Sequence, residues 1–156
     1  MDTEKKLDYE QTKHKALKIL EYRTHFESEL KTKLKRAGAE DENVEMVMEF
    51  LKEYNFVNDS ELSLKYAKDL KNLKKFGKKR VYAELIKKGV SAELAQNAID
   101  ELSWEDGDVL YRMIEKKLCG NTERKNIDKC IRYFLYKGYS YDEIKRALER
   151  IKAEEY

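Results

Sequence analysis

Hydrophobic residues recur at the same offsets around three glycines, Gly38, Gly89 and Gly138, which stand about 50 residues apart. An apolar residue lies eight and four positions before each glycine, and others lie six, nine, ten and thirteen positions after it. The aligned residues are Leu30, Leu34, Val44, Val47, Met48 and Leu51 in the first copy, Val81, Leu85, Ala95, Ala98, Ile99 and Leu102 in the second, and Cys130, Phe134, Ile144, Ala147, Leu148 and Ile151 in the third. These offsets follow one face of an α-helix, so each glycine separates two amphipathic helices.

A further helical segment precedes each glycine-terminated helix, at about 13–22, 59–73 and 108–118. The chain is therefore predicted to be all-α, with three three-helix repeats at 12–56, 57–103 and 104–156 after an N-terminal extension at 1–11. The links are expected at 55–58 and 103–107. Small repeats of this kind are stabilised by stacking on their neighbours, which predicts an elongated, curved helical repeat array of right-handed type. A single irregular bundle is the alternative.

Local signals in the middle repeat agree with this pattern. Asn58 is placed as an N-cap with Glu61 three residues later, as in a capping box, and Asp59 complements the helix dipole. A break is expected at 76–77, and Gly89 ends the following helix. Two residues after their glycines, Ser91 and Ser140 are placed as N-caps, and Ser140 with Glu143 completes a capping box. The first repeat has Glu40 and Asp41 at this point, which is a less clear signal.

Composition favours helices and excludes several classes of protein. The 156 residues contain no proline and only six glycines, and 41% of them are charged, which disfavours a sheet with many hairpins. No run is apolar enough to span a membrane and the first residues lack a signal-peptide core, so we expect a cytoplasmic protein. We expect Cys119 and Cys130 to be thiols that fill small gaps, with a disulfide the less favoured alternative.

Positive charge is concentrated in one segment although the net charge is only +2. Residues 65–88 contain ten Lys or Arg against two acidic residues, which predicts a basic surface for a polyanion or an acidic protein. Arg80 is the favoured contact because a guanidinium suits phosphate or carboxylate. A second basic group, in the third repeat, is expected to continue the same surface. The predicted binding residues are Lys71, Lys74, Lys75, Lys78, Lys79, Arg80, Lys87, Lys88, Lys125 and Arg132. A solvated lysine-rich face is the alternative.

Catalysis and metal binding have no support in the sequence. His14 and His25 have no carboxylate or thiol at ligand spacing, and no nucleophile or phosphate-loop motif is present. We expect no cofactor. Tyrosines such as Tyr66 and Tyr82 near the basic segment suit stacking on single-stranded bases, but tyrosine at helical spacing more often packs in a core.

Two motifs carry a family resemblance. Arg23-Thr24-His25, Glu29-Leu30 and Lys33-Leu34 resemble an Arg…Glu-Leu…Lys-Leu signature. The second motif comprises Asn58, Asp59, Leu62, Tyr66, Ala67, Gly77, Arg80, Val81, Glu84, Leu85, Lys88, Gly89 and Val90. On these motifs the chain resembles the RecX family of bacterial RecA regulators. It departs from the family at Asn58 for Asp, Leu62 for an aromatic residue, Lys78 for Pro and Leu70 for Arg.

The resemblance implies a non-enzymatic protein whose partner is the RecA recombinase filament, and single-stranded or double-stranded DNA is a further candidate partner. We expect a monomer, because nothing in the sequence demands a dimer. It implies binding in the groove of RecA–DNA filaments and inhibition of ATP hydrolysis, strand exchange and LexA cleavage, which would modulate DNA repair and the SOS response. The residues expected to maintain the shared structure are Asn58, Asp59, Tyr66, Gly77, Leu85 and Gly89. The alternatives are a sequence-independent DNA-binding protein that competes with RecA for DNA, and a helical scaffold for another protein.

Overall fold

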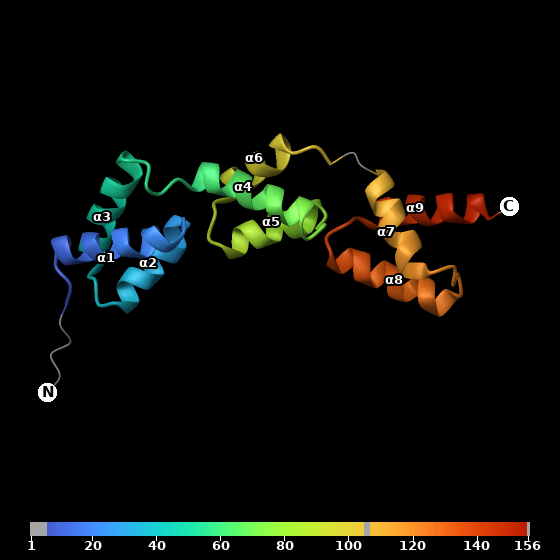
Figure 1. Ribbon diagram of the computed structural model, residues 1–156, viewed down its shortest axis with the longest axis horizontal. Helices are drawn as coiled ribbons and strands as arrows, with labels where there is room; N and C mark the ends of the chain where they lie inside the picture. The colour runs from blue at the N-terminus through green and yellow to red at the C-terminus, as the bar shows by residue number, and fades with distance from the viewer. Residues whose placement is uncertain (1–5, 105–106, 156) are drawn as a thin grey trace, which may run out of the picture. The chain divides into compact units, whose positions relative to one another are not determined.

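The chain folds into α-helices throughout the residues that the computed structural model describes, 6–104 and 107–155 (Figure 1). The only strand-like pairing in this part of the chain is a single bridge between Leu7 and Ala39. The prediction of an all-α fold is confirmed. The nine helices of the described residues are α1 (Tyr9–Tyr22), α2 (Glu27–Arg36), α3 (Asp41–Glu53), α4 (Asp59–Asn72), α5 (Lys78–Lys87), α6 (Ala92–Glu101), α7 (Gly107–Leu118), α8 (Arg124–Tyr136) and α9 (Tyr141–Glu154).

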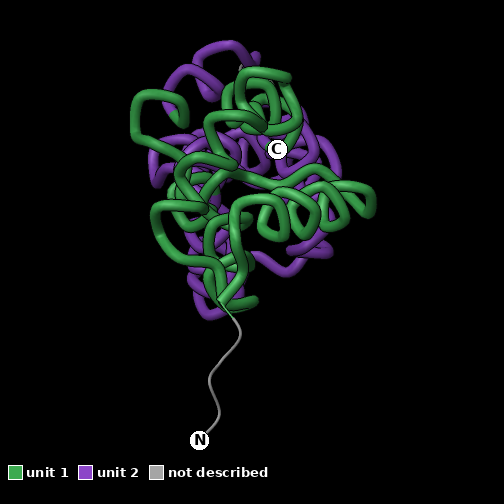
Figure 2. Tube along the Cα trace, turned by 90° about the vertical axis from the view of Figure 1, so that its left-hand side faces the viewer, with its two compact units in different colours: residues 1–66, 85–95 green, residues 67–84, 96–156 purple. Residues whose placement is uncertain are grey.

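The chain divides into two compact units, coloured separately in Figure 2. Unit 1 contains residues 1–66 and 85–95, and unit 2 contains residues 67–84 and 96–156. Unit 1 thus includes α1–α3, and unit 2 includes α7–α9. The predicted repeat boundaries at residues 12, 57 and 104 stay predictions. Residues 105–106 of the predicted link at 103–107 lie outside the described residues.

The three glycines end their helices in the same way. Gly38, Gly89 and Gly138 have φ angles of 102°, 84° and 100°, a region that side chains disfavour. Each glycine N–H bonds to the carbonyl three residues earlier, and the next N–H bonds to the carbonyl five residues before it, which is the Schellman arrangement. The carbonyls that accept this second bond belong to Leu34, Leu85 and Phe134. The apolar residue four positions before each glycine therefore supplies both a buried side chain and the acceptor that closes the helix.

The aligned apolar positions form the core, as predicted. All of them are buried except Leu102, which follows the last residue of α6 at Glu101 and no longer lies on the helical face. In unit 1 the core cluster joins α1, α2 and α3 and includes Leu34, Val47 and Leu51. In unit 2 a separate cluster joins α7, α8 and α9 around a buried phenylalanine, Phe134.

The first helix begins earlier than predicted, at Tyr9 and not near Lys13. The reason is a capping box that the apolar pattern did not reveal. The Asp8 carboxylate accepts the Gln11 N–H at 2.8 Å, and the Gln11 side-chain oxygen accepts the Asp8 N–H at 3.0 Å. Two backbone donors at the helix start are thereby satisfied, so the helix extends by one turn.

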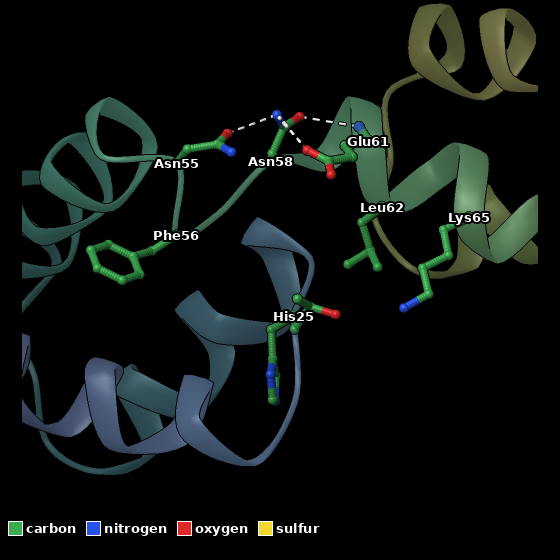
Figure 3. Close-up of a pocket in the computed structure, with 8 residues that line it drawn as sticks. His25, Asn55, Phe56, Asn58, Glu61, Leu62 and Lys65 are labelled. Atoms are coloured by element: carbon green, nitrogen blue, oxygen red, sulfur yellow. Dashed lines mark hydrogen bonds between the residues drawn. The ribbon is translucent and has the colours of Figure 1, made fainter.

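The predicted cap of α4 is half of a capping box. The Asn58 side chain accepts the N–H of Glu61 at 3.1 Å, but the Glu61 carboxylate meets the Asn58 side-chain amide and not its backbone (Figure 3). By contrast Ser140 and Glu143 make both bonds of the box at the start of α9. The Ser91 hydroxyl accepts the N–H of Leu94 at 3.2 Å, which confirms it as a cap.

The two cysteines are free thiols in different environments. Cys130 is buried in the core of unit 2 and fits the prediction of a gap-filling residue. Cys119 is exposed, so for this residue the prediction was wrong; it follows α7 at a φ of 49°, outside the apolar face of the helix. Within residues 6–104 and 107–155, no helix is both long enough and apolar enough to cross a membrane.

Candidate interaction surface

The loop between α4 and α5, residues 73–77, carries part of the predicted basic segment and is held by the end of α8 within unit 2. The Gly77 N–H donates to the Lys137 carbonyl at 2.8 Å, and the Lys79 N–H donates to the Gly138 carbonyl at 3.3 Å. In return the Lys137 ammonium donates to the Lys74 carbonyl at 3.2 Å, and the Tyr139 hydroxyl donates to the Lys75 carbonyl at 2.7 Å. These four bonds fix the loop backbone, and we call this contact the latch.

Two glycines make the latch possible because the two backbones touch at this point. A Cβ on Gly77 would lie 2.5 Å from the carbonyl carbon and oxygen of Gly138. A Cβ on Gly138 would lie 2.4 Å from the Cβ and backbone nitrogen of Arg80. Since the obstructing atoms are mostly backbone, no side-chain movement relieves the clash. Gly77 is therefore required by close packing, which explains its place in the shared motif.

Arg80, the favoured contact from the sequence, already has partners inside the protein. Its Nε donates to a Glu84 carboxylate oxygen at 2.9 Å, and its Nη1 donates to the Tyr136 carbonyl at 3.1 Å. The guanidinium also lies over the rings of Phe76 and Tyr136, 4.6 and 4.5 Å from their centroids. With only 22% of its side chain exposed, Arg80 reinforces the latch. Its predicted role in binding stays a prediction.

Four lysines around the latch remain available to a partner. Lys74, Lys75, Lys78 and Lys79 are exposed, and in the described residues none of them has a carboxylate within ion-pair distance. Lys71 differs, because its ammonium lies 5.5 Å from the ring centroid of Trp104. Four unpaired ammonium groups on a fixed backbone produce a concentrated positive potential, which suits an acidic surface or a phosphate backbone.

The second predicted basic group lies on the helix that supplies the latch. Lys125 and Arg132 are exposed on α8, and their spacing places them on the same helical face as Tyr136. The Tyr136 carbonyl accepts the hydrogen bond from Arg80. The side chains on this face therefore lead along α8 toward the latched loop. At the next position on the helix, Tyr133 lies under Lys117, whose ammonium is 3.7 Å from the ring centroid.

The remaining predicted residues lie in unit 1. Lys87 is exposed. The Lys88 ammonium is 3.6 Å from a Glu29 carboxylate oxygen and 5.8 Å from the centroid of the Tyr66 ring. The edge of that ring packs against Phe26, with centroids 5.9 Å apart. Tyr66 therefore serves as a core-edge residue, as the more frequent role of tyrosine predicts.

Asp59 and Gly89, two more residues of the shared motif, position α2 in unit 1. The Asp59 carboxylate accepts the Glu27 N–H at 2.8 Å, which satisfies a free donor at the start of α2 from 32 residues away. Burial raises the pKa of Asp59, although the bond from Glu27 acts in the opposite direction. A Cβ on Gly89 would lie 2.5 Å from the Ser28 side chain, so Gly89 also provides the room that α2 needs.

A small hollow of about 180 Å³ lies next to this region, between the start of α4 and the segment before α2 (Figure 3). It is lined by Thr24, His25, Asn55, Phe56, Asn58, Glu61, Leu62 and Lys65. The Asn58 side chain bonds to both Asn55 and Glu61, so the linker before α4 is fixed by its own polar side chains. The hollow is too small for a cofactor. Among the described residues, no group of three or more His, Cys, Asp or Glu is placed to hold a metal ion.

The latch residues from α8 were missed in the sequence. Tyr136, Lys137 and Tyr139 hold a loop that lies about 60 residues earlier in the chain. The repeat pattern did identify Gly138, but only as the residue that ends a helix. No local signal relates that glycine to Gly77.

Comparison with known proteins places these features in one family. Residues 13–51 match the first three-helix domain of RecX, and residues 58–99 match its second three-helix domain. The chain is 36% identical over 148 residues to the regulatory protein RecX of Clostridioides difficile strain 630, a match that covers 92% of this chain and 69% of the relative. It is 33% identical over 151 residues to the regulatory protein RecX of Clostridium perfringens strain 13, covering 92% and 70%.

Solved structures show the same fold. The crystal structure of RecX from Lactobacillus salivarius matches with a TM-score of 0.78 at 23% identity, covering 93% of this chain and 97% of that one. A second crystal structure, of a regulatory protein RecX, also gives a TM-score of 0.78, at 19% identity over 96% of this chain and 81% of that one. With both domain matches, the sequence relatives and the fold in agreement, the chain belongs to the RecX family of regulatory proteins.

Proposed function

We propose that this protein regulates the RecA recombinase by binding RecA–DNA filaments in the filament groove and inhibiting their activities, ATP hydrolysis, strand exchange and LexA cleavage. It acts by binding and not by catalysis, as a cytoplasmic monomer that modulates DNA repair and the SOS response. Membership of the RecX family supports a regulatory role. The observation that carries the assignment to a surface is the latched loop, which presents four unpaired lysines on a fixed backbone.

A fixed loop is suited to this task for an energetic reason. Binding normally loses conformational entropy because loops and side chains become ordered at the interface. A loop whose backbone is already held by four hydrogen bonds loses little more backbone entropy when it binds. The lysine ammonium groups then add steering toward an acidic or phosphate-bearing groove. Such a ligand shifts a filament between states only through its different affinity for them. The proposed inhibition therefore requires tighter binding to the inactive or shortened filament.

The test is RecA ATP hydrolysis on single-stranded DNA, titrated with this protein, together with DNA binding by this protein alone. If the protein regulates the filament, ATP hydrolysis should be inhibited when far fewer than one molecule of this protein is present per RecA subunit. The protein alone should then bind DNA too weakly to explain that inhibition. If ATP hydrolysis by a cognate RecA is unaffected at stoichiometric protein, the proposal is wrong.

A second function, direct competition for DNA, is favoured by one observation in unit 2. Tyr136 is 72% exposed, and Tyr133 lies 3.7 Å and 5.4 Å from the ammonium groups of Lys117 and Lys137, measured to its ring centroid. Exposed aromatic rings between cations suit stacking of single-stranded bases. This function predicts inhibition that tracks DNA occupancy and decreases steeply with salt in the absence of any contact with RecA.

A further inference from the structure

A second basic site lies in unit 1, in a hollow of about 450 Å³ beside His25. Its volume is within the range of small-ligand sites, about 300–1,000 Å³. Cations dominate the lining and no carboxylate contributes to it. The lining residues are Lys15, Lys18, Ile19, Tyr22, Arg23, His25 and Lys33.

The face of α1 brings most of these side chains together. Lys15, Lys18, Ile19 and Tyr22 follow the i, i+3, i+4, i+7 spacing of one helical face, at the end of α1 that leads to α2. Lys33 reaches the hollow from α2. Tyr22 is 91% exposed, so its ring stabilises no core and is available to a planar partner.

The imidazole of His25 forms the inner wall. It is 1% exposed, with Nδ1 2.9 Å from the Arg23 carbonyl and Nε2 2.6 Å from the Lys33 ammonium. Because an ammonium can only donate, Nε2 must accept, and the ring proton lies on Nδ1. Figure 3 shows the ring directed away from Asn58 and Glu61. A neutral, fixed histidine thus orients the Lys33 ammonium at the wall of the hollow.

The electrostatics of the hollow favour an anion. Burial lowers the pKa of His25, and the charges of Arg23 and Lys33 lower it further, while the Arg23 carbonyl and the Glu29 carboxylate act in the opposite direction. Arg23 is partly neutralised by Glu29 at 3.3 Å. Lys15 and Lys18 have no ion-pair partner among the described residues. An incoming phosphate would therefore meet three ammonium groups, those of Lys15, Lys18 and Lys33.

We infer that this hollow binds a nucleoside polyphosphate, with its phosphates at Lys15, Lys18 and Lys33 and its base stacked on Tyr22. Charges that converge on a hollow favour a free nucleotide over a nucleic-acid strand, which would require cations distributed along a groove. The hollow involves none of the residues of the latch. The site is therefore independent of the proposed RecA-binding surface, and its failure would leave that proposal untouched.

The test is calorimetric titration of the full chain with ATP at about 0.15 M salt, repeated with two matched double variants. Lys15→Gln with Lys18→Gln removes two of the phosphate contacts, and we expect affinity to fall about tenfold or more, given about 1.5–3 kcal/mol for a charged hydrogen bond. Lys145→Gln with Lys152→Gln removes the same charge from exposed positions of α9 and is expected to leave affinity within about twofold. If both double variants weaken ATP binding equally, the proposed site is wrong.

Substitutions of Tyr22 distinguish nucleotide binding from the binding of a simple anion. Tyr22→Ala should weaken ATP binding about fivefold or more and leave inorganic pyrophosphate binding unchanged, whereas Tyr22→Phe should retain ATP affinity, because stacking contributes about 1–3 kcal/mol per base. Since Tyr22 is exposed, neither variant disturbs folding. If Tyr22→Ala binds ATP as the wild type does, or if affinity for oligothymidylate exceeds that for ATP and increases with strand length, the inference is wrong.

Protonation of His25 gives an independent readout. In addition to burial, the charges of Arg23 and Lys33 lower the pKa of His25, and the Glu29 carboxylate raises it. Bound phosphate would offset the two positive charges, so saturating ATP should raise the pKa of His25, measured from its ring proton shifts by NMR. In the Lys15→Gln, Lys18→Gln variant the same change in the His25 titration should require at least about tenfold more ATP, in line with the lower affinity. An unchanged His25 pKa in the wild-type protein at saturating ATP would contradict a ligand in this hollow.

Discussion

The two lysine-rich regions of this protein differ in what determines their shape. In the latched loop of unit 2 the backbone is fixed first, by hydrogen bonds and by contact between Gly77 and Gly138, and the lysines extend outward without partners. In the hollow of unit 1 the helices are fixed by their core, and lysines of α1 and α2 line the same hollow as a buried imidazole, which Lys33 contacts. The first arrangement suits the proposed large partner, and the second suits the proposed small ligand. Charge density in the sequence alone does not distinguish them.

Replacing Gly77 should break the first region and leave the second intact. Gly77→Ala places a Cβ 2.5 Å from backbone atoms of Gly138, and we expect the free energy of unfolding to decrease by about 3 kcal/mol, measured in urea. Gly107→Ala is the matched control, because nothing lies within 4 Å of its Cβ position, and it should change stability by less than about 0.5 kcal/mol. Equal effects from the two substitutions would show that the latch is not a close backbone contact.

Arg80 tests whether the latch depends on side chains as well as backbone. Arg80→Met retains the aliphatic chain but removes the donors to Glu84 and to the Tyr136 carbonyl, and should cost about 1–2 kcal/mol of unfolding free energy. Lys79→Met, at the adjacent exposed position, should change stability by less than about 0.5 kcal/mol. An unchanged free energy of unfolding in Arg80→Met would show that the Arg80 side chain does not reinforce the latch.

His25 provides a smaller effect confined to the second region. Because the folded pKa of His25 is lowered below its ordinary value of 6.5, the folded protein binds fewer protons than the unfolded chain between that pKa and pH 6.5. The stabilisation is fully present above pH 6.5 and is lost as the pH falls through the folded pKa. His25→Gln should therefore make the free energy of unfolding depend less on pH between pH 8 and pH 5. We expect this change to be smaller than the two preceding effects. An unaltered slope in His25→Gln would mean that burial and the neighbouring charges do not lower the pKa of His25 in the folded protein.

Much of the fold was predictable because its signals are local. The ends of α2, α5 and α8 each require a glycine with positive φ and an apolar residue four positions earlier, and both appear in the sequence at a fixed distance. The early start of α1 was missed because Asp8 and Gln11 are polar and do not contribute to an apolar pattern.

The sites depend on contacts that sequence spacing does not encode. The basic segment could be identified in the sequence. Its contacts with Lys137 and Tyr139 could not, because they join segments about 60 residues apart. Arg80 was predicted to be an exposed cation. Its i,i+4 spacing to Glu84 was a sequence signal for an ion pair that was missed, whereas the Tyr136 carbonyl, 56 residues away, could not be identified as a partner. Likewise, Asp59 was predicted to complement its own helix, whereas it also caps α2. The charged motif residues Arg80 and Lys88 therefore have partners inside the protein, whereas the four unpaired lysines of the latched loop are not among the residues that match the motif.

The most direct test of the proposed function uses the lysines that the latch presents. Lys74→Glu with Lys78→Glu alters two exposed, unpaired side chains and should leave unfolding free energy within about 0.5 kcal/mol of the wild type. Lys145→Glu with Lys152→Glu makes the same change of charge on α9. RecA ATP hydrolysis on single-stranded DNA is then measured against increasing concentrations of each protein. The account predicts that the loop variant needs at least about tenfold more protein for half-inhibition, while the α9 variant inhibits as the wild type does. Inhibition by the loop variant at the wild-type concentration would contradict the assignment of the latched loop as the RecA-binding surface.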